Sequence, residues 1–483
     1  MADQFLQEAY LRATSSNLLY NRNRNRWQFL LNSYMGGDDY RRFNYLNRHQ
    51  LESDSEYAKR LQTTPLDNQV RSIVSLYISY LFRESPEREF GVLANDPQLD
   101  DILEDADLDG RNLDNFMKEC AIWSIVFGHC WIAVSKAKSD AASRAQEIDM
   151  NIRPYLSVMS PLVVTDWRWE RAPNGYFDLS YIKYVEEVND TMNVVKEWTK
   201  QTITTTIIDL KHTEAKDVVV EPNELGKLPF VLLYSERSPV RGLGMPIIGD
   251  IADQQQMIYN ELSEVYESIR LDTHPSLVAT NDTNIGTGAG SLIIMPENLD
   301  PNLKPYLLEF NGAPVEAIYK SINQRQAMIN SMANVGAARA TESRTMSGIA
   351  IETEFQLLNA RLSEIADNLE LGEEQIWRLI SEYQGQEWDG CIEYPNEFAM
   401  RNTVHELDQL TTMKNLTSNP MILAEIDSKL ADILGMEDFD DVNDLTDNVT
   451  SEDPETAQDV LTDTPAELAA DAQVPDDKED TKS

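Results

Sequence analysis

The stretch from Ile349 to Tyr383, IAIETEFQLLNARLSEIADNLELGEEQIWRLISEY, decides the fold. Apolar residues recur in it at three- and four-residue spacing, which predicts one buried face of a long helix. At ~1.5 Å per residue this helix is about 50 Å long, too long to lie inside one small core. We therefore expect it to pack against neighbouring copies of the chain as well as its own. The apolar positions are Ile351, Phe355, Leu358, Leu362, Ile365, Leu369, Ile376 and Ile380.

Two shorter helices are predicted before it. The first opens at Gly244-Met245-Pro246 and ends before His274-Pro275, and the second runs from Pro314 to about Val335. Between them, residues 275–310 are extended and glycine-rich, which predicts a short β-containing insert. The segment AARATESRTMSG (337–348) joins the second helix to the long one, and its small polar residues predict a loop.

Upstream, the pattern indicates helices followed by a sheet. Thr64-Pro65 predicts a helix start, because proline suits the first helical position. Residues 113–134 predict a buried helix running into a strand. From Arg153 to Tyr234 the apolar period changes to two, which predicts an antiparallel region of five or six strands. The helix face after Pro65 is Leu66, Val70, Ile73, Val74, Tyr77 and Leu81, and sheet packing is expected of Trp167, Trp169, Tyr176, Tyr181 and Tyr184.

Charge and composition exclude several classes of protein. The chain of 483 residues has 41 Lys+Arg and 82 Asp+Glu, a net charge of −41, which disfavours a nucleic-acid reader with a basic face. The three arginines in NRNRNRW (21–27) fit solvated helix faces or ion pairs between subunits better than phosphate contacts. No secretory signal is expected at the N-terminus, and the longest apolar stretches are too short to span a bilayer.

Candidate metal and catalytic motifs are incomplete. Residues 105–110 fit the first six positions of a calcium loop, but Phe116 stands where the closing glutamate belongs. We expect this acidic run to complement the N-terminus of the next helix instead. Cys120, His129 and Cys130 lie in an apolar stretch and are expected to be core residues. No complete phosphate-binding, zinc-hydrolase or nucleophile motif occurs, so we expect no enzyme activity and no cofactor.

The C-terminal segment 436–483 is set apart by its charge. It holds 17 Asp and Glu against two Lys. It has one aromatic residue, and so it cannot bury enough apolar surface to offset the entropy of ordering. We predict a disordered acidic tail. It either serves as a solvated end that aids solubility or docks on a basic partner.

Three stretches, together with the order of the predicted elements, resemble the portal proteins of tailed double-stranded DNA bacteriophages. They are YAKRLQTTPLDNQVRSIVSLYISYLF (57–82), RPYLSVMSPLVVTDWRWE (153–170) and MSGIAIETEFQLLNARL (346–362). The resemblance covers roughly residues 20–435 and rests on the order helix, small β insert, helix, polar loop and long helix. The short end after the long helix and the acidic tail depart from the family's pattern.

The resemblance implies an α+β fold: a helical wing with an antiparallel β region, paired stem helices, a small β-containing clip and a long wing helix. The implied segments are the wing at 1–244 with its β region at about 153–234, stem helix 1 at 245–272, the clip at 273–310, stem helix 2 at 311–336, the tunnel loop at 337–347, the long wing helix at 348–385, a crown-like end at 386–435 and the disordered acidic tail at 436–483.

The resemblance also implies a function and a set of partners. Portals of this kind are rings, usually of twelve copies, at one capsid vertex, and genomic DNA passes through the channel during packaging and ejection. The implied partners are further copies of the chain, the terminase large subunit, a head-completion or adaptor protein, and the major capsid and scaffolding proteins. Double-stranded DNA would pass without sequence specificity. The implied location is the virion, at the capsid vertex, and the host cytoplasm during assembly, with no membrane.

The site residues implied by the resemblance lie in the tunnel loop. Arg339 and Arg344 would touch passing phosphates, in a channel whose acidic wall otherwise holds DNA off. The plainer alternative is an ordinary surface connection between two helices. A rival function is an acidic assembly or chaperone-like interaction protein without a channel. The candidate loop residues are Arg339, Thr341, Glu342, Ser343, Arg344 and Met346.

Overall fold

The computed structural model describes most of the chain up to residue 398 and short pieces beyond it. The chain divides into two compact units, Met1–Ala399 and Met400–Ser483, and the fold below is that of the first. The residues described are 2–138, 143–189, 191–273, 276–278, 284–285, 293–294, 300, 306–308, 313–336, 339, 348–398, 410–414, 416, 422–423, 426 and 429. The predicted acidic tail at 436–483 and most of the predicted clip lie outside them.

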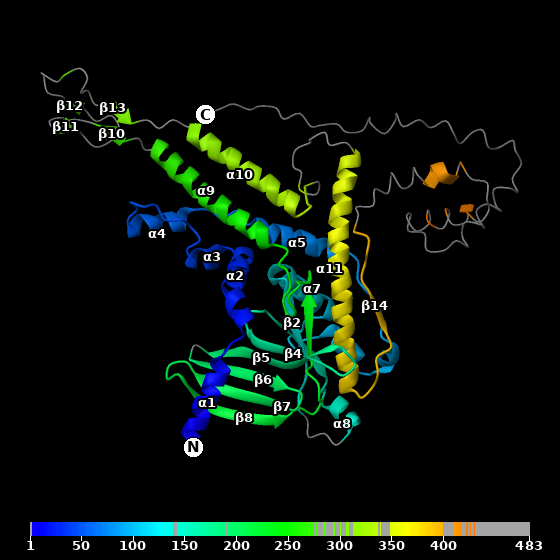
Figure 1. The fold of residues 1–483 in the computed structure, drawn as a ribbon. Helices are drawn as coiled ribbons and strands as arrows, with labels where there is room; N and C mark the ends of the chain where they lie inside the picture. Colours follow the sequence, from blue (N-terminus) through cyan, green and yellow to red (C-terminus); the bar gives the residue numbers. More distant parts are fainter. Residues whose placement is uncertain are drawn as a thin grey trace, which may run out of the picture. The chain divides into compact units, whose positions relative to one another are not determined.

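The N-terminal part is helical, as predicted (Figure 1). The predicted start of one helix at Pro65 is wrong, because α5 begins at Gln69. The Asn68 side chain accepts the backbone N–H of Arg71 and caps α5, whereas Thr64 ends the preceding helix. The predicted face is otherwise buried, from Val70 to Leu81. The helices are α1 (Ala2–Thr14), α2 (Leu18–Met35), α3 (Gly37–Arg42), α4 (Asp54–Thr63) and α5 (Gln69–Leu81).

A buried helix leads directly into a central strand, as residues 113–134 predicted. α7 (Leu113–Phe127) ends at Gly128, whose φ of 89° is left-handed, and β2 (His129–Lys136) follows. The side chains of Cys120, His129 and Cys130 are fully buried, so their assignment to the core is confirmed. β2 pairs antiparallel with β3 (Pro154–Met159) on one side and β9 (Phe230–Tyr234) on the other.

The predicted β region holds seven strands rather than five or six, and they divide between two sheets. β3 and β9 pair with β2, which lies upstream of the region, so period alone could not place them. The other five form an antiparallel meander in sequence order. The expected packing holds for Trp167 and Tyr184, which are buried, but is wrong for Tyr176, which is 73% exposed. The meander strands are β4 (Val164–Arg171), β5 (Phe177–Asn189), β6 (Met192–Thr199), β7 (Thr202–Asp209) and β8 (Glu214–Pro222).

Three long helices follow the sheets. α9 (Gly249–Thr273) and α10 (Ala313–Met332) lie antiparallel and pack against each other (Figure 1). α9 begins later than Gly244, because Gly244 still pairs with Arg237 in a β-bridge. α11 (Gly348–Tyr383) matches the predicted long helix, and its apolar stripe from Leu358 to Ile380 is buried. It packs against α5, β2, β9 and β14.

Short elements complete the first unit. Between α9 and α10, two antiparallel pairs lie in the segment predicted as the clip: β10 with β13 and β11 with β12. β1 pairs with β14 and so joins the chain after α11 to the N-terminal part. The bounds are β1 (Glu87–Glu89), η1 (Gly91–Asn95), α6 (Leu99–Glu104), α8 (Arg144–Asp149), β10 (Ser276–Val278), β11 (Asn284–Ile285), β12 (Ile293–Ile294), β13 (Tyr306–Leu308) and β14 (Cys391–Glu393).

The acidic run at 105–110 is a loop between α6 and α7 rather than the first turn of a helix. Asp105 accepts the backbone N–H of Gly110, and Asp107 accepts that of Asp109, so the carboxylates hold the loop itself. Within the described residues, no group of three or more His, Cys, Asp and Glu side chains is placed to hold a metal ion. The helices of the described part include none that is long and apolar enough to cross a membrane.

Candidate functional site

Of the predicted loop residues, the structure describes Arg339. Thr341, Glu342, Ser343, Arg344 and Met346 lie outside the described residues. The Arg339 guanidinium is half-buried and donates to Asn330 Oδ1 at 3.1 Å and to Gln69 Oε1 at 2.7 Å. Burial lowers the pKa of this arginine from its ordinary value. The arginine is thus held by two neutral amides, one on α10 and one on the first residue of α5.

Asp67 connects the same two helices. Its Oδ2 atom accepts from Gln69 Nε2 at 2.5 Å and from Gln326 Nε2 at 3.0 Å. Gln69 therefore uses its amide nitrogen toward Asp67 and its amide oxygen toward Arg339. The result is a continuous set of hydrogen bonds from α10, through the start of α5, to Arg339, the third residue of the predicted loop.

The last turn of α10 is fixed from two further sides. Tyr77 of α5 donates its hydroxyl to the backbone oxygen of Ala333 at 2.5 Å, and Arg361 of α11 donates to that of Met332 at 2.9 Å. Asn334 follows with a φ of 54°, the left-handed conformation that commonly ends a helix. These bonds satisfy backbone oxygens that a helix end otherwise leaves without partners. The root of the predicted loop, by which we mean residues 332–336, is therefore fixed to α5 and α11.

The α9–α10 pair is joined by polar as well as apolar contacts. Glu261 Oε1 accepts from Arg325 Nε and from Ser321 Oγ, both at 2.8 Å. Arg325 also donates to Gln254 Oε1 at 3.0 Å, so its guanidinium bridges two residues of α9. The buried apolar residues of the two helices include Ile258 and Val265 of α9 and Ile322 and Ile329 of α10.

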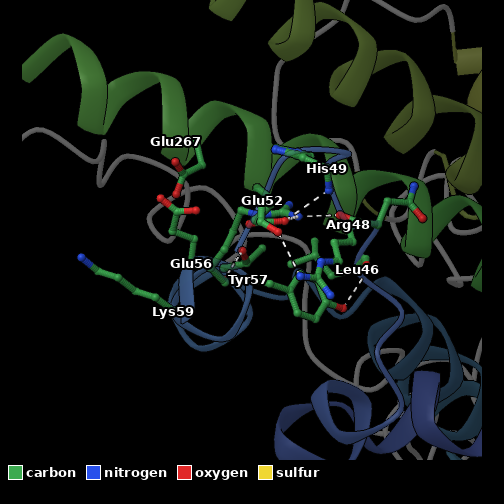
Figure 2. A network of polar contacts seen from close by, with 12 residues as sticks. Leu46, Arg48, His49, Glu52, Glu56, Tyr57, Lys59 and Glu267 are labelled. Carbon is green, nitrogen blue, oxygen red and sulfur yellow. Dashed lines mark hydrogen bonds and ion pairs between the residues drawn. The ribbon is translucent and has the colours of Figure 1, made fainter. Parts of the chain in front are cut away.

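A second network holds α9 from the side of α4 (Figure 2). Arg60 and Glu52 form a buried ion pair, with Nε–Oε1 and Nη2–Oε2 distances of 2.8 Å each. Arg60 also donates to Ser263 Oγ of α9 at 2.9 Å, and His49 Nε2 lies 2.7 Å from Glu264 Oε1. The hydrogen bonds from Arg60 lower the pKa of Glu52 to about 2. α9 is thereby fixed to the N-terminal helices along one side and to α10 along another.

After the exposed Glu316 and Lys320, the outer surface of α10 is almost free of charge. From Ser321 to Met332 the sequence contains one charged residue, Arg325, and that residue is paired with Glu261. The exposed side chains of this stretch are polar amides, a hydroxyl and small or flexible apolar groups. Such a surface offers a polyanion neither strong attraction nor strong repulsion. The exposed residues are Asn323, Gln324, Ala327, Met328 and Ser331.

Sequence reasoning missed the residues that hold the root of the loop. Asp67, Gln69 and Tyr77 are distant in sequence from Arg339 and Ala333, so no local pattern connects them. The polar run Asp67-Asn68-Gln69 at the start of an apolar helix was the available signal. It indicates a helix cap, but it does not indicate what else the side chains bind. Of the arginines in residues 21–27, Arg26 forms an ion pair with Asp253 of α9, within the same chain.

Comparisons with known proteins give matches by structure alone. No protein-family description matches the chain, and no curated protein matches it in sequence. The fold is similar to a chain in the virion of a native gene transfer agent (GTA) particle, with a TM-score of 0.42 and 12% identity over 79% of this chain and 96% of that chain. It is also similar to a chain in the neck of an empty GTA particle computed with C6 symmetry. That match has a TM-score of 0.42 and 11% identity over 74% of this chain and 89% of that chain.

Proposed function

We propose that the chain is a portal-type ring protein. Its ring would stand at a capsid vertex, pass double-stranded DNA through a central channel and bind the packaging motor and head-completion proteins. The observation that carries the proposal is the order of elements along the chain. The antiparallel helices α9 and α10 are joined by a segment with two short β pairs, and the 36-residue helix α11 follows. This order is the one that the sequence resemblance to portal proteins implies for stem, clip, stem and long wing helix.

The surface of α10 supports a role beside moving DNA. A channel wall must let the duplex slide, and the affinity of a protein for DNA grows with each free Lys or Arg that reaches a phosphate. Between Ser321 and Met332, α10 presents amides and small groups, and Arg325 is occupied by Glu261. We place this part of the helix, from Ser321 to Met332, along the channel for that reason.

The anchored root of the loop supports a division of roles between the two arginines. Arg339 is held by Gln69 and Asn330, so we assign it to positioning the loop rather than to contact with phosphate. Arg344 keeps the proposed role of contact with passing DNA. Because exposed ion pairs are individually weak, at ~0–1 kcal/mol, a ring of them can touch DNA without stopping it.

DNA packaging into heads assembled with variant chains tests the proposed function. We expect Arg344→Gln to assemble normally and to package or retain less DNA, because a weak contact is removed. Thr341→Val, in the same loop, is the matched control without a change of charge. Normal packaging with Arg344→Gln would remove the phosphate-contact role. Heads that package DNA without any copy of the chain would overturn the portal function itself.

A further inference from the structure

A surface patch that includes two arginines lies where a hairpin meets the edge of the five-stranded sheet. We call Trp169, Arg171, Phe177, Val240 and Arg241 the arginine patch. Arg241 Cζ lies 3.9 Å from the centre of the Phe177 ring and 6.0 Å from that of Trp169. Arg171 Cζ lies 4.9 Å from the Phe177 ring. Both guanidinium groups therefore stack on aromatic faces, which leaves their N–H edges available for other partners.

Neither arginine of the patch has an ion-pair partner within the described part of the chain, although both are exposed. The chain has 82 acidic residues against 41 basic ones, so carboxylates that could pair with them are plentiful. Arg168, three residues before Arg171, shows the ordinary arrangement, since it pairs with Asp166 at 3.3 Å. In the described part of the chain, therefore, no carboxylate neutralises these two cations.

Strand alternation explains how the patch stays free of carboxylates. Successive side chains of a strand point to opposite faces, so Trp169 and Arg171 share one face of β4 while Glu170 points to the other. In β5, Phe177 lies directly opposite Arg171, and Asp178 lies opposite Glu170. The two acidic residues thus sit on the far side of the sheet from the arginines. Asp178 is moreover paired with Lys200.

The hairpin that carries Arg241 is fixed in place. Its base is closed by the bridge between Arg237 and Gly244. At its tip, Gly242 has a φ of 84° and packs so closely on β4 that a Cβ atom there would lie 2.3 Å from Trp167 Nε1. The patch is therefore formed before any partner arrives, which lowers the entropic cost of binding. Beside Arg241, Val240 is 44% exposed, and Phe177 is 39% exposed.

We propose that the arginine patch binds an acidic segment of a partner protein. Planar guanidinium groups bind carboxylates through two parallel hydrogen bonds, and aromatic residues with arginine rather than lysine are typical of protein interfaces. The exposed Val240 and Phe177 add an apolar component that suits a peptide. Nucleic acid fits less well, because its phosphates are far denser than peptide carboxylates and a net charge of −41 repels it. The proposal does not depend on the channel.

Titration of the full chain with a fluorescent 12-residue peptide of Asp, Glu and Leu tests this site. We expect saturable binding at low salt that weakens about tenfold in the double variant Arg171→Gln/Arg241→Gln, since two exposed ion pairs are lost. The matched control is Arg22→Gln/Arg24→Gln, which removes the same charge from exposed positions of α2. A third variant, Arg241→Lys, keeps the charge but loses the planar stacking group, and it should also weaken binding.

Three outcomes would overturn the proposal. One is the absence of saturable binding of the peptide to the unmodified chain. Another is an equal loss in the α2 control, which would show a general effect of net charge. The third is tighter binding of a single-stranded or duplex oligonucleotide of equal charge, which would assign the patch to nucleic acid. Unchanged thermal unfolding of the variants confirms that a loss of binding is not a loss of fold.

Discussion

The Lys183 ammonium lies 2.7 Å from the backbone oxygen of Arg12, inside the junction between α1 and the five-stranded sheet. Its Nζ also donates to the backbone oxygen and the hydroxyl of Ser15, and burial lowers its pKa from the ordinary value. A positive charge at this point is favourable, because the C-terminal end of a helix carries a partial negative charge. The apolar contact of α1 with the sheet is small by comparison, with Ala13, Val195 and Ile208 at its centre.

We predict that Lys183→Met loosens α1 without unfolding the rest of the chain. The variant leaves the oxygens of Arg12 and Ser15 without their donor, at a cost of about 1–3 kcal/mol. The measurement is limited proteolysis between α1 and α2, together with hydrogen exchange of the α1 amides. Lys200→Met is the control, since Lys200 forms only an exposed pair with Asp178. Equal protection of α1 in all three proteins would contradict this role of Lys183.

The Glu52–Arg60 pair predicts a specific pH dependence. The pKa of Glu52 is about 2 in the folded chain, below its ordinary 4.5, chiefly because Arg60 donates to it. A carboxylate with a lowered pKa contributes its full stability above about pH 4.5, and the contribution is lost as the pH falls toward 2. We expect Glu52→Gln to lower stability by about 3 kcal/mol at pH 6, as for a broken buried pair, and by much less near pH 3.

Thermal unfolding midpoints at pH 6 and pH 3 check this prediction. The control is Glu84→Gln, which removes an exposed carboxylate paired with Arg83 and should shift the midpoint little at either pH. A difference between the Glu52 variant and the unmodified chain that stays constant over this pH range would show that the carboxylate charge is not what stabilises the network.

Alanine substitutions at Gly128 and Gly175 separate two effects of adding a Cβ atom, the strain of a left-handed backbone and steric overlap with a neighbour. Their φ angles are 89° and 90°, so alanine at either position meets the same backbone strain, about 1 kcal/mol. At Gly175 a Cβ atom would meet nothing within 4 Å, whereas at Gly128 it would lie 2.5 Å from a backbone carbon of Gly244. We expect Gly128→Ala to lose about 1–3 kcal/mol more than Gly175→Ala in the free energy of unfolding. Equal losses would mean that the contact with Gly244 can relax.

Local patterns in the sequence predicted the helices and strands that depend on residues close together in the chain. The apolar stripe of α11 repeats over many turns, and its bounds follow from the sequence almost to the residue. The start of α5 was misplaced because Pro65 fits the first position of a helix, while the residue that caps it is Asn68. The alternation of apolar and polar residues predicted strands correctly. It could not show that β3 and β9 join a different sheet from β4 to β8.

The polar sites depended on contacts that no local pattern contains. Lys183 is one lysine among alternating residues of a strand, and its partners lie about 170 residues earlier. Arg339 was selected because it is a cation in an acidic protein, and its hydrogen bond to Gln69 spans 270 residues. Arg241 sits in an ordinary turn sequence, and only the fold brings it onto Phe177.

The mass and shape of the purified chain test the central claim most directly. Sedimentation together with negative-stain electron microscopy reports both. The proposed function predicts a closed ring of many 55.0 kDa chains with a central hole wide enough for duplex DNA. A monomer or dimer at all protein and salt concentrations would contradict it and would favour an assembly factor without a channel.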